Sequence, residues 1–396
     1  MRRFAKGYVG EEFTIMKSGR CMSKDATPTD DLASMPDLEK RVLIVLSVLE
    51  ANRRSEESNE YFLPDGRRIR PTIEGIKSFL KDGAAVEAEK MQSSVDQLLR
   101  KELIIRKTDC HFLSDVGKKI GKKLLTERMS KGYDNLLLRT GASKAYSTFC
   151  ERVFGRDLSQ FNVLDMKQLN TMIEKLDLKP GETALDLGCG NGRVSEHISD
   201  MTGANVIGLD FAGEVIKSAQ QRTMNKKSRL KYVVGNMDEL SFEEGSFDAV
   251  ISIDTLYFVE SIDATIRELK RLLKPSTGRM AVFCDQNCDP DESRDILLPE
   301  NTKVGKAMRN SGMAYQAIDF TSNSGEIWLR EIKAAEELRE QFAKEGNTDI
   351  YEDRAQDARK TLESIESGRH VRYFYLARFE ENADARLQTR SKDVEP

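Results

Sequence analysis

The chain has 396 residues, of which 39% are hydrophobic and 32% are charged, and its formal net charge is -4. This length leaves room for two domains, and the slightly acidic balance argues against a chain that binds nucleic acid over its whole surface. No run of eighteen uninterrupted apolar residues occurs, and the basic start of the chain lacks the apolar segment of a secretory signal, so we expect neither a membrane span nor secretion. Six scattered cysteines without a disulfide framework favour a reducing, cytoplasmic setting.

The N-terminal third divides into a polar segment, residues 1–35, predicted to be flexible, and a small domain over residues 36–130. Apolar residues at helical spacing predict three helices in this domain, and a short hairpin and a basic helix follow them. This order resembles a winged-helix domain, with residues 93–104 similar to the recognition helix and first wing strand. In DNA-binding relatives that helix enters the major groove.

A DNA-binding role for this domain competes with a role in dimerisation or gating. Lys118, Lys119, Lys122 and Lys123 could contact phosphates. However, residues 36–130 carry an excess of only about three positive charges, far from a strongly basic domain. We therefore favour a dimerisation or gating module, and a homodimer formed through it.

The most informative stretch is Ala184–Gly192, a short apolar run that ends in an acid and then in three glycines at alternate positions. It predicts a buried parallel strand, a turn too tight for a Cβ, and a helix from Arg193. The spacing differs from the G-x-G-x-x-G of dinucleotide binders, and no P-loop lysine follows.

This pattern resembles motif I of class I S-adenosylmethionine-dependent methyltransferases, in which the turn holds the methionine end of the cofactor. The resemblance implies that the cofactor is S-adenosylmethionine and that the turn residues contact it. These residues are Asp186, Gly188, Cys189, Gly190, Asn191 and Gly192.

The following strands supply the other cofactor positions. Asp210 ends the second strand about twenty residues after the glycines, where an acid can accept hydrogen bonds from both ribose hydroxyls. Phe211 would lie against adenine. Asn236 departs from the acid that the family usually places after the third strand, although its carbonyl can accept from the adenine amine. The resemblance also implies cofactor contacts from Met237 and Ile253.

The predicted fold is α/β, a Rossmann-like seven-stranded sheet over residues 166–380 in the family's order 3-2-1-4-5-7-6. We expect a helical insertion at about 324–366 and a flexible tail at 381–396. Residues 131–165 are expected to connect the domains and cover the cofactor. In the family this region often presents a tyrosine to the cofactor carboxylate, so Tyr146 takes that role unless it simply packs in a helix.

Residues after the fourth and fifth strands are expected to face the acceptor, because ligands lie at the carboxyl ends of parallel strands. Asp254 is a candidate base or substrate anchor, or else a helix cap. Tyr257 either lines the pocket or packs. His370 is a candidate general base, or else a surface histidine. Cys284 and Cys288 lack a matching second pair of ligands, so we expect free thiols and no metal site.

The resemblance implies SN2 transfer of a methyl group to a small-molecule acceptor, with the N-, O-, S- or C-nucleophile left open. The alternative is a winged-helix DNA-binding regulator whose methyltransferase-like domain senses S-adenosylmethionine or a metabolite.

Overall fold

The computed structural model describes residues 32, 34–50, 61–62, 68–80 and 86–380. The chain divides into two compact units, Met1–Gly132 and Tyr133–Pro396. Helix α5 (Asp115–Ala142) runs through the boundary between them. Residues 1–31 and the tail from 381 onward, both predicted to be flexible, lie outside the described residues. Leu32 and Met35 correct the first of these predictions, because they are buried in the core of the first unit.

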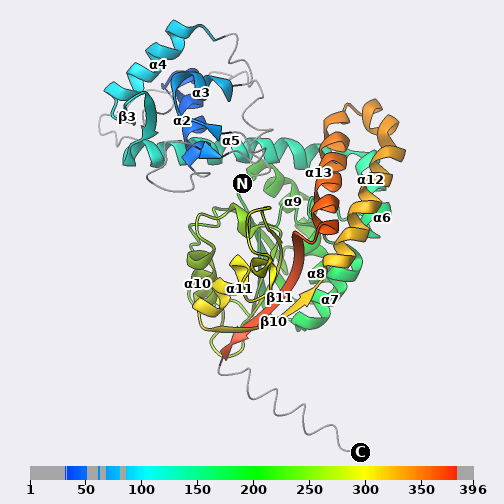
Figure 1. Cartoon of the computed structure of the whole chain (residues 1–396). Helices are drawn as coiled ribbons and strands as arrows, with labels where there is room; N and C mark the ends of the chain where they lie inside the picture. The colour runs from blue at the N-terminus through cyan, green and yellow to red at the C-terminus, as the bar shows by residue number, and fades with distance from the viewer. Residues whose placement is uncertain (1–31, 33, 51–60, 63–67, 81–85, 381–396) are drawn as a thin grey trace, which may run out of the picture. The chain divides into compact units, whose positions relative to one another are not determined.

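The first unit packs helices against a short hairpin (Figure 1). Thr72 caps its second helix by accepting a hydrogen bond from the Gly75 amide. Lys101 donates to the buried Glu39 carboxylate at 2.8 Å. The described elements besides α5 are α2 (Asp37–Glu50), β1 (Tyr61–Phe62), β2 (Arg68–Ile69), α3 (Ile73–Ser78), α4 (Ala88–Arg100), β3 (Ile104–Lys107) and β4 (Cys110–Leu113).

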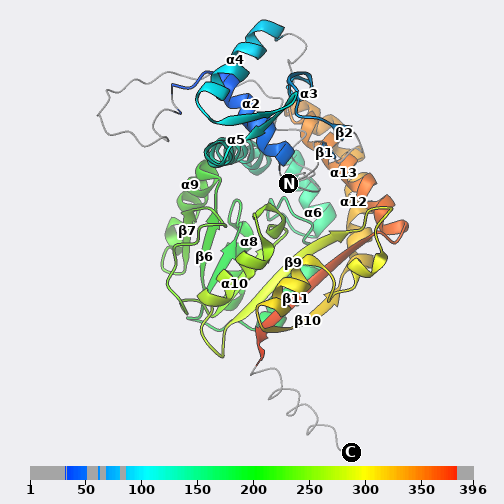
Figure 2. The ribbon, with the colours of Figure 1, turned by 60° about the vertical axis from the view of Figure 1, so that its left-hand side comes forward.

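The second unit is built on a seven-stranded sheet in the order β10-β11-β9-β8-β5-β6-β7 (Figure 2). The predicted strand order is thereby confirmed. Strand β11 runs opposite to the other six strands, antiparallel to both β10 and β9, and the remaining neighbours in this sheet pair in parallel. The strands are β5 (Thr183–Leu187), β6 (Asn205–Asp210), β7 (Leu230–Val234), β8 (Ala249–Ile253), β9 (Arg279–Asn287), β10 (Met313–Asp319) and β11 (His370–Phe379).

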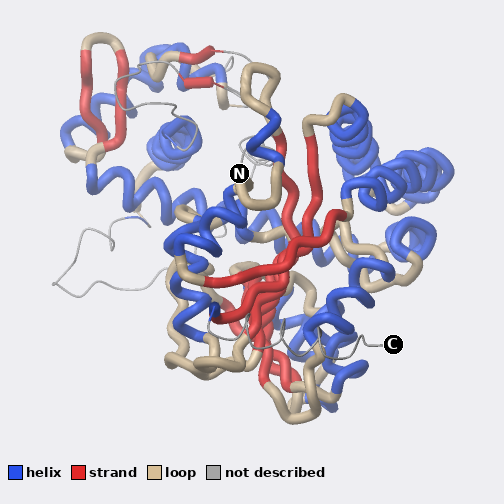
Figure 3. The backbone as a smooth tube through the Cα atoms, turned by 60° about the horizontal axis from the view of Figure 1, so that its bottom comes forward, coloured by secondary structure: helices blue, strands red, loops and turns tan. Residues whose placement is uncertain are grey.

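Helices cover both faces of this sheet (Figure 3). Alternate strand residues point to opposite faces, and each face buries its own apolar cluster. One face packs on α7 (Met166–Leu176), α8 (Arg193–Thr202) and α9 (Gly213–Arg222). The other packs on α10 (Ile262–Leu272) and α11 (Lys303–Asn310).

A helical layer stands beside the sheet, formed by α6 (Lys144–Phe154), α12 (Thr321–Lys344) and α13 (Thr348–Glu366). The last two helices form the insertion between the sixth and seventh strands of the sheet. Within this layer Arg354 and Glu331 form a buried ion pair. Across the described residues, no helix combines the length and the apolar character needed to cross a bilayer.

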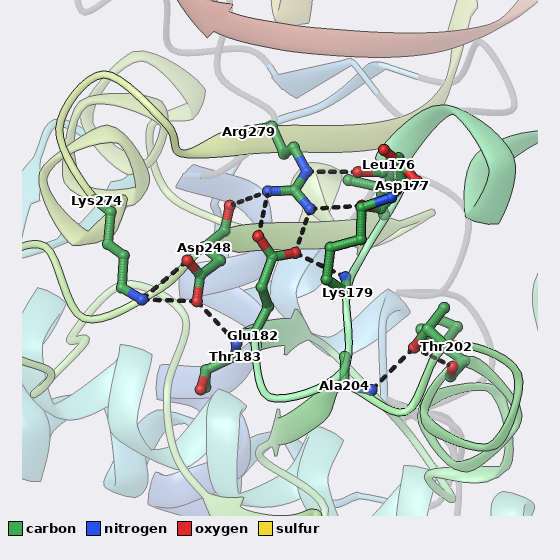
Figure 4. A network of polar contacts seen from close by, with 11 residues as sticks. Leu176, Asp177, Lys179, Glu182, Thr183, Thr202, Ala204, Asp248, Lys274 and Arg279 are labelled. Atoms are coloured by element: carbon green, nitrogen blue, oxygen red, sulfur yellow. Dashed lines mark hydrogen bonds and ion pairs between the residues drawn. The ribbon is translucent and has the colours of Figure 1, made fainter.

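The amino-terminal edge of the sheet is held by a polar network centred on Arg279 (Figure 4). Its guanidinium donates to the Leu176 and Asp177 carbonyls at the end of α7 and pairs with Glu182. Next to it, Lys274 pairs with Asp248 at 2.8 Å. These contacts connect strands to helices at the edge opposite the glycine turn, where the strands begin.

Candidate functional site

The three glycines of the turn have left-handed backbones, with φ of 75°, 52° and 71° at Gly188, Gly190 and Gly192. A Cβ on Gly188 would lie 2.4 Å from Thr255 Cγ2, and a Cβ on Gly192 would lie 2.3 Å from Tyr232 Cε1. Side chains are therefore excluded from these two positions by both conformation and space. The turn leaves β5 at the switch point of the sheet, between β6 on one side and β8 on the other.

Asp210 joins the second strand to this turn. Its Oδ2 accepts a hydrogen bond from the Gly190 amide, and its Oδ1 accepts one from the Ala212 amide, both at 2.9 Å. Burial raises the pKa of this carboxyl, while the amide donors act in the opposite direction. Each carboxylate oxygen has capacity for a further donor, so the group can still accept from two hydroxyls.

Three residues expected to contact the cofactor have side chains that are engaged inside the protein. The Asp186 carboxylate accepts from Ser195 Oγ at 2.5 Å and so supports the first turn of α8. Burial raises its pKa to about 6. Ile253 is only 6% exposed and packs in the core of the sheet. The Cys189 side chain packs on Gly208, since a Cβ added at Gly208 would lie 2.7 Å from the Cys189 sulfur. These three side chains are directed into packed protein, and the cofactor contact predicted for these residues stays a prediction.

Asn191 ties the glycine turn to the loop that covers it, residues 157–165. Its Nδ2 donates to the Ser159 carbonyl at 2.6 Å, and its Oδ1 accepts from the Arg193 amide. Ser159 has a left-handed φ of 46° although it is not glycine. Its buried hydroxyl finds no hydrogen-bond partner within the described residues, which makes it a candidate ligand contact.

Sequence reasoning missed the last turns of α5, which belong to the second unit. The Tyr133 ring contacts Phe211 and Phe258 edge-on, with centroids 5.4 and 5.9 Å apart. Asp134 accepts from the Val215 amide and so caps α9 from a distant helix. Leu137 lies 3.7 Å from the Cβ position of Gly190. The predicted lid region contained these residues, but no local pattern singled out Tyr133.

Tyr146 takes the packing role that was its alternative. It is fully buried on α6, and its ring stacks with Phe149 and Phe161 at 5.6 and 6.4 Å between centroids. Its hydroxyl donates to the Gln160 carbonyl at 2.9 Å. The predicted contact with a cofactor carboxylate is therefore wrong, since the hydroxyl supports the covering loop.

The two residues proposed to follow β7 lie in different surroundings. The side-chain oxygen of Asn236, Oδ1, accepts a hydrogen bond from the Asp238 amide at 3.1 Å, which closes a local turn. This oxygen keeps a second lone pair for an incoming amine. Met237 is partly buried against the core of the α10 and α11 face.

Asp254 forms a buried ion pair and is not a helix cap. It has a left-handed φ of 56°, and its two oxygens accept from Arg372 at 2.8 and 3.0 Å. Its Oδ2 also accepts from the Val163 amide of the covering loop. Thr255 occupies the cap position of the short helix that follows. The ion pair with Arg372 favours a structural role for this buried carboxylate, and the predicted role as a base or substrate anchor stays a prediction.

Arg372 is a second residue that sequence reasoning missed. The same guanidinium donates to Asp285 at 2.9 Å and to Gln168 at 2.9 Å. Burial lowers its pKa, but the charges of Asp254 and Asp285 outweigh this and raise the pKa above its ordinary value. The side chain therefore stays charged although it is fully buried.

His370 and Tyr257 lie near the same group of charges, since His370 is close to Asp285 and Tyr257 is close to Asp254 and Asp285. The His370 ring is buried, with Nδ1 2.8 Å from Asn287 Oδ1 and Nε2 3.8 Å from Asp285, so the surface alternative is wrong. Tyr257 is 40% exposed. Desolvation, followed by the charges of Asp254 and Asp285, raises the pKa of its hydroxyl. No cluster of three or more potential metal ligands occurs among the described side chains.

Comparison with known proteins finds a domain that matches part of the second unit. Residues 185–281 match a family described as a methyltransferase domain. Phosphoethanolamine N-methyltransferase 3 of Arabidopsis thaliana is 26% identical over 213 residues, which cover 51% of this chain and 43% of that protein. Sterol 24-C-methyltransferase of Pneumocystis carinii is 32% identical over 146 residues, which cover 33% of this chain and 38% of that protein. The chain thus spans less than half the length of these curated relatives.

A solved structure shares the fold. Phosphoethanolamine N-methyltransferase 2 of Haemonchus contortus, determined in complex with S-adenosyl-L-methionine, superposes with a TM-score of 0.51 at 21% identity. The match covers 62% of this chain and 60% of that one. Together with the glycine turn and the sheet order, these similarities show that residues 185–281 of the second unit carry a methyltransferase domain and that the unit has the fold of the solved methyltransferase.

Proposed function

We propose that this protein is an S-adenosylmethionine-dependent methyltransferase that acts on a small-molecule acceptor. One observation carries the proposal: at the switch point of the sheet, the glycine turn is hydrogen-bonded to Asp210 through the Gly190 amide. The relatives named above act on phosphoethanolamine and on a sterol, and their names supply the reaction class rather than the acceptor of this chain.

The residues present fit this cofactor. A Cβ would fill the space at Gly188 and Gly192, so the bare backbone can approach a ligand. Asp210 can accept from two ribose hydroxyls, and the buried Ser159 hydroxyl lacks a partner in the described part of the chain. When bound, the cofactor supplies a methyl group activated on a sulfonium sulfur.

The chain's own residues then bind, orient and exclude water. In this proposal the glycine turn and Asp210 hold the donor, and Phe211 and Asn236 contact its adenine ring. Tyr133 and Phe258 cover the site, and the loop through Ser159 closes the end near Asn191. Transfer between a donor and an acceptor held at attack distance needs mainly orientation and a dry site. Asp254 serves as a structural anchor, and Tyr257 contacts the acceptor.

A turnover assay tests the proposal. The full chain is incubated with the methyl donor and a cell extract, and mass spectrometry follows S-adenosylhomocysteine and any product heavier by one methyl group. We expect product formation that Asp210→Asn reduces at least about tenfold through weaker cofactor binding, equivalent to about 1.4 kcal/mol. Binding of the donor without product from any metabolite pool would contradict the enzyme and favour a sensor.

The DNA-binding alternative gains no support from the described residues of the first unit. The exposed surface of α4 carries both signs of charge. Its exposed charged residues are Glu89, Lys90 and Arg100, Asp96 is partly exposed, and the exposed Glu87 directly precedes the helix. This mixed charge is unlike a helix that enters a major groove. We therefore assign the first unit to dimerisation or gating, to be checked by sedimentation of the full chain. A reducing, cytoplasmic setting accords with the free thiols of all five described cysteines.

A further inference from the structure

Near the carboxyl ends of β8 and β9, where the acceptor is expected, a buried arginine, Arg372, pairs with two carboxylates. Arg372 is fully buried, and four of its N–H groups donate to Asp254, Asp285 and Gln168. A guanidinium has five such groups, so its capacity is almost used. The hydrogen-bonding capacity of Asp254, whose side chain is 5% exposed, is also mostly used. Its carboxylate accepts two of these hydrogen bonds and a third from the Val163 amide.

Stability alone does not require this arrangement. Burying charges costs several kcal/mol, and well-packed apolar residues often serve as well in such positions. The backbone of Asp254 is also in the left-handed region, with φ of 56°, which adds strain. The other two arginines that are buried within the described part of the chain serve elsewhere, since Arg279 holds a helix end and Arg354 pairs with a glutamate between helices. Only Arg372, of these three, pairs with carboxylates near the carboxyl ends of β8 and β9, since Asp254 directly follows β8 and Asp285 lies two residues before the end of β9.

Without the guanidinium, Asp254 and Asp285 would form an anionic pocket at the place where an acceptor is expected. Two carboxylates beside aromatic rings are the chemistry that recognises ammonium and guanidinium groups. The rings at this edge are those of Tyr133, Tyr257 and Phe258, which contact one another. With Arg372 in place, its single positive charge offsets one of the two negative charges, and its N–H groups occupy both oxygens of Asp254 and one oxygen of Asp285. A cationic group on a ligand therefore meets a carboxylate pair whose charge is halved and most of whose acceptor sites are taken.

We propose that Arg372 is a specificity-determining residue: its guanidinium occupies a carboxylate subsite and so excludes acceptors that carry an ammonium or guanidinium group there. The acceptor then presents an uncharged group to Tyr257 and Phe258. This inference rests on the proposed function for its meaning, but the occupancy of the subsite can be measured by binding alone.

The test compares the full-length wild type with Arg372→Ala, using ethylammonium and methylguanidinium as probes in calorimetric titrations. We expect Arg372→Ala to bind at least one probe about tenfold or more tightly than the wild type does, which corresponds to about 1.4 kcal/mol. The matched control is Arg372→Ala combined with Asp254→Asn, which keeps the cavity but removes one carboxylate and should lose most of the gain. Equal binding by this double variant would overturn the proposal.

The wild type supplies a second measurement that does not depend on the folding of Arg372→Ala. If the wild type binds ethylammonium saturably and Asp254→Asn abolishes this binding, the subsite is open and the proposal is wrong. Absence of such binding to the wild type, together with turnover of uncharged acceptors in preference to their amine analogues, supports it. Failure of the proposed function would appear separately, as absence of S-adenosylhomocysteine with every acceptor, while the binding result would stand.

Discussion

The glycines of the turn differ in what surrounds them, and this difference predicts unequal costs of substitution. Gly188→Ala places a methyl group 2.4 Å from Thr255 Cγ2, whereas Gly190→Ala meets Leu137 at an ordinary 3.7 Å. Both variants pay about 1–2 kcal/mol for a left-handed alanine, and the clash adds about 1–3 kcal/mol at Gly188 only. Urea unfolding should therefore show a larger loss of free energy for Gly188→Ala. Equal losses would show that Thr255 moves aside without cost.

Asp186 predicts a pH dependence of stability. Burial raises its pKa to about 6 in the folded protein, above the value of about 3.9 in an unfolded chain. Between these values the folded state binds more protons than the unfolded state, so the free energy of unfolding falls as pH rises from about 4 to 6. The effect amounts to about 3 kcal/mol for this carboxyl.

The matched variant for Asp186 is Asp186→Asn, whose amide oxygen can still accept from Ser195. The difference in unfolding free energy, wild type minus variant, should decrease across this pH range by up to about 3 kcal/mol. Denaturant titrations at several pH values measure it. A difference that stays constant would mean that Asp186 titrates normally in the folded protein.

At the scale of single residues, the sequence indicated the backbone positions of the site better than the side-chain partners. Glycine spacing and an acid at a strand end are local signals, so the turn and Asp210 could be located. Arg372 could not be, because its partners Asp254 and Asp285 lie 118 and 87 residues away in the chain. Likewise, nothing local distinguishes Tyr133 from Tyr146, since only the packing of α6 against α12 decides which ring is buried in the helical layer.

At the scale of elements, the strands of the sheet were predictable because each parallel strand is a short apolar run followed by a turn and an amphipathic helix. Helix α5 was not. The sequence predicted a basic helix that closes the domain 36–130 and a separate connector over residues 131–165, whereas one helix runs from Asp115 to Ala142. Its apolar residues do not keep to one stripe along its length, so periodicity gives no warning that the helix continues.

The network at the amino-terminal edge predicts a stability effect that is separate from function. Arg279 is buried and holds the end of α7, so Arg279→Met leaves Glu182 and two carbonyls without their donor. Loss of one partner from such a buried network costs about 3–5 kcal/mol. Lys274→Met is the matched control, because its ion pair with Asp248 is 45% exposed on the lysine side and is worth about 1 kcal/mol or less.

Thermal and urea unfolding measure both amino-edge variants, and cofactor affinity is measured beside them. We expect Arg279→Met to lose stability while its affinity for the methyl donor, below the unfolding transition, stays within about twofold of the wild type, about 0.4 kcal/mol. A marked loss of affinity in Arg279→Met would show that this edge also shapes the site at the carboxyl edge.

At the scale of the whole molecule, the division into two units at Gly132 predicts where ligand binding is felt. The residues proposed to hold the donor all belong to Tyr133–Pro396, including the last turns of α5 with Tyr133, Asp134 and Leu137. Donor at 100 times its dissociation constant stabilises the folded second unit by about 2.7 kcal/mol against unfolding. Hydrogen exchange of the intact chain should therefore slow in residues 133–142, 188–192 and 210–216.

The same experiment separates a passive first unit from a gating one. If the first unit serves only for dimerisation, exchange in α2, α4 and the β3–β4 hairpin should not change when the donor binds. If it gates the site, protection should extend N-terminally along α5, since this single helix runs through both units. Because the helix is continuous, the test can be read residue by residue from Asp115 to Ala142. Protection that stops near Gly132 would contradict gating, and protection that reaches Asp115 would establish that donor binding is communicated to the first unit.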